Sequence, residues 1–186
     1  EDIIKAADAI MVARGDLGVD ISLEKIPTIQ KKIIHIANRY GKPVITATQM
    51  LQSMVHNYRP TRAEVTDVAN AILDGTDAVM LSEETAKGRY PVESVRMLSK
   101  IAREIEPGFV RKDTFETLHG RDGEVTIPDA ISMATCQVAH DLNTKAILTC
   151  TQTGSTARFI SKYRPKQYIL AVTTSFNTYR RLALVW

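Results

Sequence analysis

Two charged residues and a glycine follow a run of purely apolar residues near the start of the chain. The segment Ala9–Ala13 carries no polar side chain, and Arg14, Gly15 and Asp16 come directly after it. A glycine lets the backbone approach a ligand closely, and consecutive N–H groups at such a turn can hold an anion. Asp16 would repel that anion unless a cation stood between them. The segment therefore indicates a divalent cation that bridges the Asp16 carboxylate and an anionic substrate.

Both charged residues of this segment also have a simpler interpretation. On the local sequence alone, the favoured interpretation of Asp16 is that it only caps the next helical turn. We interpret Arg14 as a structural residue whose charge pairs with a neighbouring helix or subunit.

Polar side chains also follow two later apolar segments. Thr48 comes directly after Val44–Ala47, and Ser82 comes directly after Ala78–Leu81. In (β/α)8 barrels, catalytic groups gather at the carboxyl ends of the strands. If the three apolar segments are neighbouring parallel strands, we expect these hydroxyls and the first charged segment to meet on one rim.

The first part of the chain has the pattern of alternating strands and helices. The three apolar segments are mostly continuous rather than alternating, which is typical of parallel strands covered on both faces. Helices are expected at 26–40, 61–73 and 91–107, and the second begins with a capping box formed by Thr61 and Glu64. Three such strands alone leave two unpaired edges, so an incomplete (β/α)8 barrel explains the pattern best.

A second αβαβα pattern follows a stretch that has no sustained period. A helix is expected at 128–142 from its stripe of Ile131, Thr135, Val138 and Leu142, and Ser175 is expected to cap a final helix. Between them, strands are expected at 146–149 and 168–172 and a helix at 155–163. The predicted organisation is a partial (β/α)8 barrel at 1–107, a linker at 108–123 and a partial α/β domain at 124–186.

Composition limits the classes of partner. The net charge is +3, from 24 basic and 21 acidic residues among 186; this balance argues against nucleic acid, which favours a concentrated basic face. No apolar run approaches the roughly 20 residues that a membrane span needs. Cys136 and Cys150 are predicted to be reduced packing residues, which, with no secretory signal, favours the cytoplasm. The missing initiator Met and the end inside a helical pattern suggest a chain truncated at both ends.

A hydroxyl-rich loop lies between a predicted strand and helix of the second part. Residues 151–156 read Thr-Gln-Thr-Gly-Ser-Thr. Hydroxyls and the amides of a helix N-terminus can together bind a phosphate. The alternative is that Thr153 or Ser155 only caps the helix.

Four segments resemble the pyruvate kinase family. They are IMVARGDLGVDI, KPVITATQML, RPTRAEVTDVANAILDGTDAVMLSEETAKGRYP and TGSTARFISKYRP. They occur in the same order as in the family, and the match covers almost the whole chain. The resemblance implies an α/β fold made of the last three βα units of a TIM (β/α)8 barrel, followed by part of a three-layer α/β C-terminal domain. It implies phosphoryl transfer from phosphoenolpyruvate to ADP in glycolysis, giving pyruvate and ATP, with Mg2+ (or Mn2+) and K+ as cofactors.

The resemblance also implies roles for residues at the rim. Asp16 would ligate the divalent metal, and the backbone N–H groups of Gly15 and Asp16 would hold the substrate carboxylate. Thr48 would lie beside the reacting enol carbon and take part in protonating the enolate, and Ser82 would line the site.

Regulation and assembly are implied as well. The family's allosteric pocket would use Thr151, Thr153, Gly154, Ser155 and Thr156, for a sugar-phosphate or nucleotide effector. Gln152 stands where some members activated by sugar bisphosphates have Lys, so a monophosphate effector or none is as consistent as a bisphosphate. The segment Arg59 to Asp74 matches a subunit-contact helix, which suggests a homo-oligomer, a tetramer in the full-length protein.

Departures from the family pattern limit the expected activity. The family's Lys-Ile-Glu-Asn motif belongs just upstream of residue 1, and the potassium-binding residues and lid domain are also missing, so this chain alone is predicted to be inactive. Glu83 replaces a common glycine and would be strained if that position has a positive φ. The alternative function is a non-catalytic module, derived from the same fold, that binds phosphate ligands or serves assembly.

Overall fold

The chain divides into two compact units, Glu1–Phe109 and Val110–Trp186. The computed structural model describes residues 1–108 and 126–186. The linker predicted at 108–123 therefore lies outside the described residues, apart from Gly108. Within the described ranges, none of the helices has both the length and the apolar character that a membrane crossing requires.

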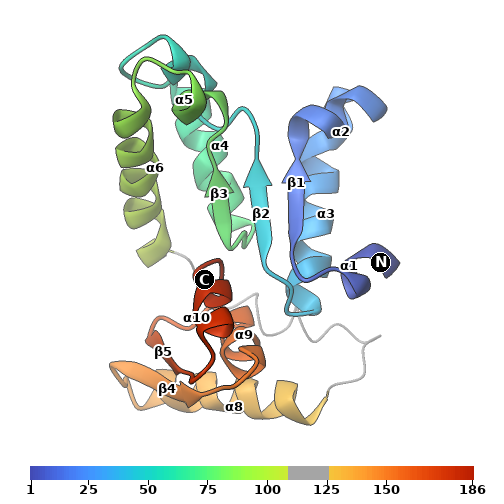
Figure 1. Cartoon of the computed structure of the whole chain (residues 1–186), viewed down its shortest axis with the longest axis vertical. Helices are drawn as coiled ribbons and strands as arrows, with labels where there is room; N and C mark the ends of the chain where they lie inside the picture. The colour runs from blue at the N-terminus through green and yellow to red at the C-terminus, as the bar shows by residue number, and fades with distance from the viewer. Residues whose placement is uncertain (109–125) are drawn as a thin grey trace. The chain divides into compact units, whose positions relative to one another are not determined.

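Unit 1 is built on a three-stranded parallel sheet (Figure 1). Its strands are β1 (Ile10–Ala13), β2 (Val44–Ala47) and β3 (Ala78–Met80), in that spatial order. Ala13 pairs with Ala47, and Ala47 pairs with Met80. All three strands therefore end at the same edge of the sheet, as the sequence predicted.

Helices connect the strands of unit 1 and follow their ends. The long ones are α3 (Ile26–Arg39), α4 (Arg62–Leu73) and α6 (Pro91–Ile105), which confirms the three predicted helices. The short ones are α1 (Asp2–Ala6), α2 (Arg14–Asp20), α5 (Glu83–Ala86) and the 3-10 turns η1 (Leu23–Lys25), η2 (Gln52–Val55) and η3 (Glu106–Gly108). Figure 1 shows α3 and α4 behind the strands and α2 and α5 beyond their carboxyl ends.

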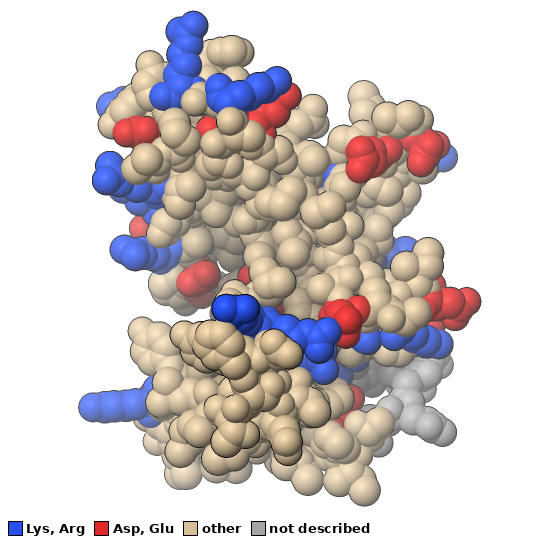
Figure 2. Space-filling view, viewed as in Figure 1, with Lys and Arg blue, Asp and Glu red and all other residues tan. Residues whose placement is uncertain are grey.

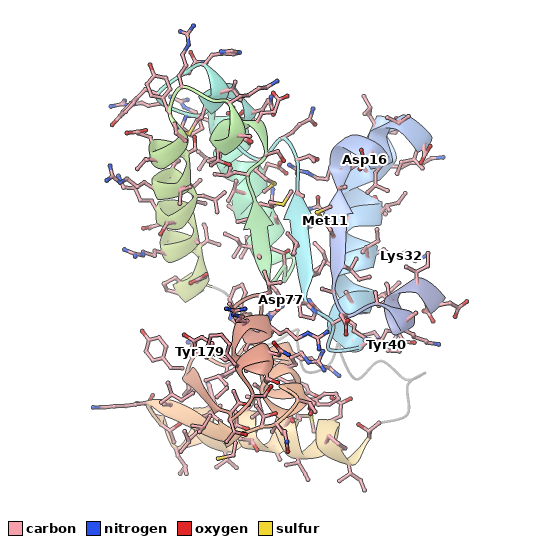
Figure 3. The ribbon with its side chains drawn as sticks, in the orientation of Figure 1. Met11, Asp16, Lys32, Tyr40, Asp77 and Tyr179 are labelled. Atoms are coloured by element: carbon pink, nitrogen blue, oxygen red, sulfur yellow. The ribbon has the colours of Figure 1, made fainter. Side chains whose placement is uncertain are left out.

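The two faces of this sheet have different surroundings. Val12 and Val44 lie on the face that the helices cover and are almost completely buried. Met11 and Met80, which the register places on the opposite face, are 53% and 36% exposed. Figure 3 shows Met11 on this open side, and the surface over the strands in Figure 2 is largely uncharged. An apolar face left open is what an incomplete barrel predicts.

In residues 126–186, the described part of unit 2, there are a two-stranded parallel sheet and three helices. The strands are β4 (Ala146–Cys150) and β5 (Tyr168–Val172), and the helices are α8 (Ile127–Asp141), α9 (Ser155–Lys162) and α10 (Phe176–Leu182). Ser175 caps α10 as predicted, because its Oγ accepts a hydrogen bond from the Thr178 N–H at 3.3 Å.

The buried face of α8 differs from the one predicted. Its buried residues are Ser132, Cys136 and Ala139, which are spaced on one side of the helix. Of the predicted stripe, Ile131, Val138 and Leu142 are exposed instead, and Thr135 is half-buried. The physical reason is close packing, since small side chains on α8 leave room for the larger Ile160 and Tyr163, which join Cys136 and Ala139 in one core cluster.

The two cysteines differ in their surroundings. Both are reduced, as predicted, and Cys136 lies in the core. Cys150 is exposed, so its predicted role in packing is wrong. It lies at the end of β4 on the face that carries Leu148 and Leu170, and this face of the sheet is exposed.

A buried ion pair reinforces the contact between α8 and α9. Lys162 Nζ lies 2.7 Å from Asp129 Oδ1, and the Tyr163 hydroxyl donates to the same oxygen at 3.1 Å. Burial and the neighbouring Asp129 charge raise the pKa of Tyr163 above its ordinary value. Tyr163 therefore acts as a neutral donor that helps satisfy the carboxylate.

The packing of α8 predicts that substitutions at two neighbouring positions change the free energy of unfolding by different amounts. Ala139→Leu should lower the free energy of unfolding of unit 2 by about 1–3 kcal/mol, because extra methylene groups overpack the contact with α9. Val138→Leu, at a position 55% exposed, should change it by less than about 0.5 kcal/mol. Urea denaturation followed by the fluorescence of the single tryptophan, Trp186 in unit 2, measures both. Equal losses would contradict the observed orientation of α8.

Candidate functional site

The candidate site lies at the carboxyl edge of the unit 1 sheet. The residue after β1 starts α2, the residues after β2 form a tight turn, and those after β3 lead into α5. Because Ala13, Ala47 and Met80 are in register, the candidate residues 15, 16, 48 and 82 all follow strand ends at this edge.

The turn after β2 has an unusual backbone. Thr48 has φ of 70° and Gln49 has φ of 53°, two consecutive left-handed residues that are not glycine. This conformation is particularly unfavourable for a β-branched residue such as threonine, and each such residue costs on the order of 1–3 kcal/mol. Surrounding contacts must therefore hold this turn.

Arg14 supplies several of these contacts. Its Nε and Nη2 donate to the Thr48 carbonyl oxygen at 3.1 and 2.6 Å, and Nη2 lies 3.0 Å from Met50 Sδ. Its Nη1 makes an ion pair of 2.5 Å with Asp67 on α4. The prediction that Arg14 pairs with a neighbouring helix is confirmed.

Gly15 and Thr48 are in direct contact. The Gly15 N–H donates to Thr48 Oγ1 at 2.8 Å. A Cβ at position 15 would come 3.6 Å from the same oxygen, an ordinary van der Waals distance. The glycine thus leaves open the space beside the Thr48 hydroxyl, and a side chain there would fill it.

Asp16 has an exposed carboxylate with no hydrogen bond or ion pair to the described part of the chain. It is the third residue of α2, whose N-cap is Ala13 and which has no side-chain cap, so the interpretation of Asp16 as a cap is wrong. Figure 3 shows Asp16 on α2, beyond the end of β1. Its oxygens are therefore available to a cation.

The described residues contain no cluster of three or more His, Cys, Asp or Glu side chains that could enclose a metal. Mg2+ commonly binds through one or two protein carboxylates and takes its other ligands from substrate and water. The single carboxylate of Asp16, beside the open space at Gly15, fits this kind of site.

Glu84 connects the loops that follow β2 and β3. Its side chain is fully buried, and its two oxygens accept hydrogen bonds from the Leu51 N–H at 3.0 Å and the Ser82 N–H at 2.8 Å. The sequence does not distinguish Glu84 from Glu83, because nothing in this pair tells which carboxylate turns inward. Ser82 is thereby tied to the loop that follows Thr48, although no direct contact between Ser82 and Thr48 is found among the described residues.

Glu83 does not distort this loop. It is the first residue of α5 and has no positive φ, so the strain considered for it is absent. Its carboxylate accepts a hydrogen bond from Gln52 Nε2 at 3.0 Å and pairs with Lys87 Nζ at 2.9 Å. The hydrogen bonds from Lys87 and Gln52 lower the pKa of Glu83.

Glu64 connects the start of α4 to η2, which follows the turn at Thr48 and Gln49. The predicted capping box is confirmed, with Thr61 Oγ1 accepting from the Glu64 N–H and the Glu64 carboxylate accepting from the Thr61 N–H. The same carboxylate accepts from the N–H and the hydroxyl of Ser53, both at 2.6 Å. Burial alone would raise the pKa of Glu64, but the bonds from Ser53 and Thr61 outweigh it and lower the pKa.

A pocket of about 360 Å3 adjoins the Arg14 side chain. Its lining includes Arg14, Gly15, Gln49 and Asp67. The other lining residues carry no polar side chain and are Gly18, Val19, Leu23, Ile26 and Pro27. The pocket therefore borders the turn after β2, which Arg14 contacts. Asp16 does not line it.

The second candidate loop, at 151–156, connects β4 to α9. Thr151 Oγ1 accepts from the Gly154 N–H at 2.9 Å, and the hydroxyls of Thr153 and Ser155 lie 3.0 Å apart. Gly154, at φ of 84°, is the N-cap of α9 and has no side chain that could cap it. Thr153 Oγ1 instead accepts a hydrogen bond from the N–H of Ser155, the first residue of α9, at 3.4 Å. Thr153 thus satisfies one N–H of the first turn of α9, in line with the alternative in which it caps this helix. Thr156 is exposed in the first turn of α9.

The loop 151–156 is also held from α10. The hydroxyl of Thr178 donates to the Gln152 carbonyl at 2.7 Å. A Cβ on Gly154 would lie 3.3 Å from atoms of Thr178 and Leu182, so the loop packs closely on this helix.

These features define a class: parallel βα units with polar groups at the strand ends, followed by a second α/β unit, as in barrel enzymes that carry an additional domain. The family comparisons agree and are specific. Residues 1–95 match the family model for the pyruvate kinase barrel domain, and residues 129–186 match that for the pyruvate kinase alpha/beta domain. The chain belongs to the pyruvate kinase family. It holds the last three βα units of the TIM barrel and part of the C-terminal domain.

Relatives and a solved structure extend this match to nearly every residue. The chain is 56% identical to pyruvate kinase 2 of a Synechocystis strain, over 99% of this chain and 30% of that protein. It is 53% identical to the Geobacillus stearothermophilus pyruvate kinase, over 100% of this chain and 32% of that protein. The crystal structure of a pyruvate kinase from Cryptosporidium parvum has a TM-score of 0.92 and 48% identity, covering 98% of this chain and 37% of that one. The chain thus spans about a third of the length of these relatives.

The Glu64 contacts predict a stability difference that depends on pH. Glu64→Ala should lower the free energy of unfolding of unit 1 by about 1–2 kcal/mol at pH 7, because a cap and hydrogen bonds to a charged group are lost. Since the pKa of Glu64 is lowered on folding, its contribution is present above the ordinary pKa of 4.5 and is lost as the pH falls through the lowered value. The difference between variant and unmodified chain should therefore shrink near pH 3.

Urea denaturation followed by circular dichroism at pH 7, 5 and 3 provides the measurement. Glu104→Ala, at an exposed position of α6, serves as the control and should stay within about 0.5 kcal/mol of the unmodified chain. A Glu64→Ala effect that is the same at all three pH values would contradict the charged hydrogen-bond network.

Proposed function

We propose that this chain supplies part of the active site of a pyruvate kinase, which transfers a phosphoryl group from phosphoenolpyruvate to ADP and yields pyruvate and ATP. The observation that carries the proposal is the 2.8 Å contact between the Gly15 N–H and Thr48 Oγ1, next to an Asp16 carboxylate that has no hydrogen bond or ion pair to residues 1–108 or 126–186. Backbone donor, hydroxyl and carboxylate come from neighbouring strand ends, where a small anionic substrate and its cation can reach all three.

In this proposal Asp16 ligates Mg2+ or Mn2+, and the N–H groups of Gly15 and Asp16 bind the substrate carboxylate. In the structure the Gly15 N–H is engaged by Thr48 Oγ1. A bound carboxylate competes for this N–H, so substrate binding would release the Thr48 hydroxyl toward the enol carbon that must be protonated. Ser82, held by Glu84, lines the same edge.

The divalent cation would offset charge on the transferring phosphoryl group and on the enolate that leaves. No residue of this chain is matched to the family's potassium ligands, so K+ binding is assigned to other parts of the full-length protein. The family's catalytic Lys and second metal-binding Glu are likewise absent from this sequence. We therefore expect the isolated 186-residue chain to show no turnover.

A hybrid enzyme tests the proposed activity. Residues 1–186 of this chain replace the matching segment of the Geobacillus stearothermophilus pyruvate kinase, to which they are 53% identical. The hybrid should form pyruvate from phosphoenolpyruvate and ADP, measured by coupled NADH oxidation. Asp16→Ala should lower kcat by about 10²–10³-fold, because an electrostatic contributor at the reacting group is lost.

Asp20→Ala is the matched control for this experiment, because Asp20 is exposed and lies at the other end of α2. It should leave kcat close to that of the unsubstituted hybrid. An inactive hybrid, or equal effects of the two substitutions, would rule out the proposed role of Asp16.

We further propose that the loop 151–156 binds the phosphate of a regulatory sugar phosphate or nucleotide. The support is the set of clustered hydroxyls at the start of α9, on a backbone that Thr151 and Thr178 hold in place. If the hybrid proves inactive, this loop carries the alternative function of a non-catalytic phosphate-binding module. A cytoplasmic homotetramer that uses α4 in its subunit contacts remains part of the proposal.

Phosphate binding by this loop predicts chemical-shift changes in the 186-residue chain. In 1H–15N spectra, inorganic phosphate, glucose 6-phosphate or AMP should shift the amide signals of residues 153–156. Ser155→Ala should weaken binding about tenfold, because one hydrogen bond to a charged group is lost. Thr135→Ala, at a half-buried position of α8 outside this loop, is the control and should bind like the unmodified chain. Unshifted signals with all three ligands would exclude the site.

A further inference from the structure

We propose that Arg14 is a positioning residue whose guanidinium group holds Thr48 in its left-handed conformation and thereby directs the Thr48 hydroxyl at the Gly15 N–H. The contacts themselves stand independently of the function. Their consequence for catalysis rests on the proposed pyruvate kinase activity.

The first support is that two atoms of Thr48 are held by two consecutive residues of α2. Arg14 binds the carbonyl oxygen through two nitrogens, at 3.1 and 2.6 Å, and Gly15 binds the hydroxyl oxygen at 2.8 Å. The first turn of α2 therefore determines both the peptide plane and the side-chain direction of Thr48. A residue at φ of 70° would otherwise relax toward an extended or right-handed conformation.

The second support is the anchoring of the guanidinium group. Its third nitrogen, Nη1, pairs with Asp67 on α4 at 2.5 Å, and the Arg14 side chain is only 10% exposed. Three nitrogens in a fixed plane thus connect α4 to the turn after β2. A lysine has a single nitrogen and cannot bind the carbonyl and the carboxylate in the same geometry.

A second ion pair of α4 makes no contact with the turn after β2 among the described residues. Lys31 of α3 pairs with Asp74 at the C-cap of α4, and the Lys31 side chain is 59% exposed. None of its described contacts involves residues 48–50. Lys31→Met therefore removes an ion pair to the end of α4 without touching the turn, which makes it a matched control.

Nuclear magnetic resonance on the complete 186-residue chain tests the conformational part. The 13Cα and 13Cβ shifts of Thr48 and Gln49 should report left-handed backbone in the unmodified chain and in Lys31→Met. In Arg14→Met they should move to extended or right-handed values, and the Gly15 amide should exchange at least about tenfold faster, as expected when one hydrogen bond is lost. Arg14→Lys should show the same loss although it keeps the charge. If Arg14→Met does not fold, the chemical shifts of Arg14→Lys test the proposal instead.

The hybrid enzyme described above tests the catalytic part. Arg14→Met should lower kcat about 10²-fold, the effect of displacing a reacting group by about 1 Å, with a far smaller change in KM for phosphoenolpyruvate. A purely structural role would lower the amount of folded enzyme and leave kcat per folded molecule unchanged.

Unchanged Thr48 and Gln49 shifts in both Arg14 variants would overturn the proposal. Lost left-handed shifts with unchanged kcat in an active hybrid would overturn its catalytic part. If the unsubstituted hybrid is inactive but the 13C shifts of Thr48 and Gln49 change as expected, the proposed function is wrong. The positioning of Thr48 by Arg14 would still be supported.

Discussion

The in-register parallel pairing of β1, β2 and β3 is the constraint on which the candidate site depends. With Ala13 opposite Ala47 and Ala47 opposite Met80, the residues that follow each strand emerge at one edge. A shift of β1 by one residue against β2 would turn Val12 out of the core and Met11 into it. Burial of one face thus determines which polar groups meet at the edge.

Polar contacts then turn this edge into a rigid arrangement. Arg14 and Gly15 hold Thr48, while two carboxylates on later elements hold the turns that follow β2 and β3. Glu84 binds the backbone on both sides, at Leu51 and Ser82, and Glu64 binds η2. Each carboxylate satisfies backbone N–H groups that would otherwise be unpaired, so the network supports the loops at the same time as it positions the candidate residues.

One face of each sheet is open, as expected of a chain that spans about a third of the length of its relatives. In unit 1 the sheet face with Met11 and Met80 is open, and in unit 2 the sheet face with Leu148 and Leu170 is open. Parallel sheets are ordinarily covered on both faces. The barrel to which the family assigns unit 1 has further strands, and its interior is the face that stays open in this chain.

The sequence by itself determined the strands, the long helices, the capping box of α4 and the strand ends that carry Gly15, Asp16, Thr48 and Ser82. These depend on apolar periodicity, on local capping chemistry and on segments that resemble one family, all of which are encoded over short stretches of chain. Tertiary structure alone decided the left-handed turn at Thr48, the inward direction of Glu84 and the small-residue face of α8. The physical reason is that each of these depends on partners distant in sequence: Arg14 for the turn, Leu51 for Glu84, and the bulk of Ile160 and Tyr163 for α8.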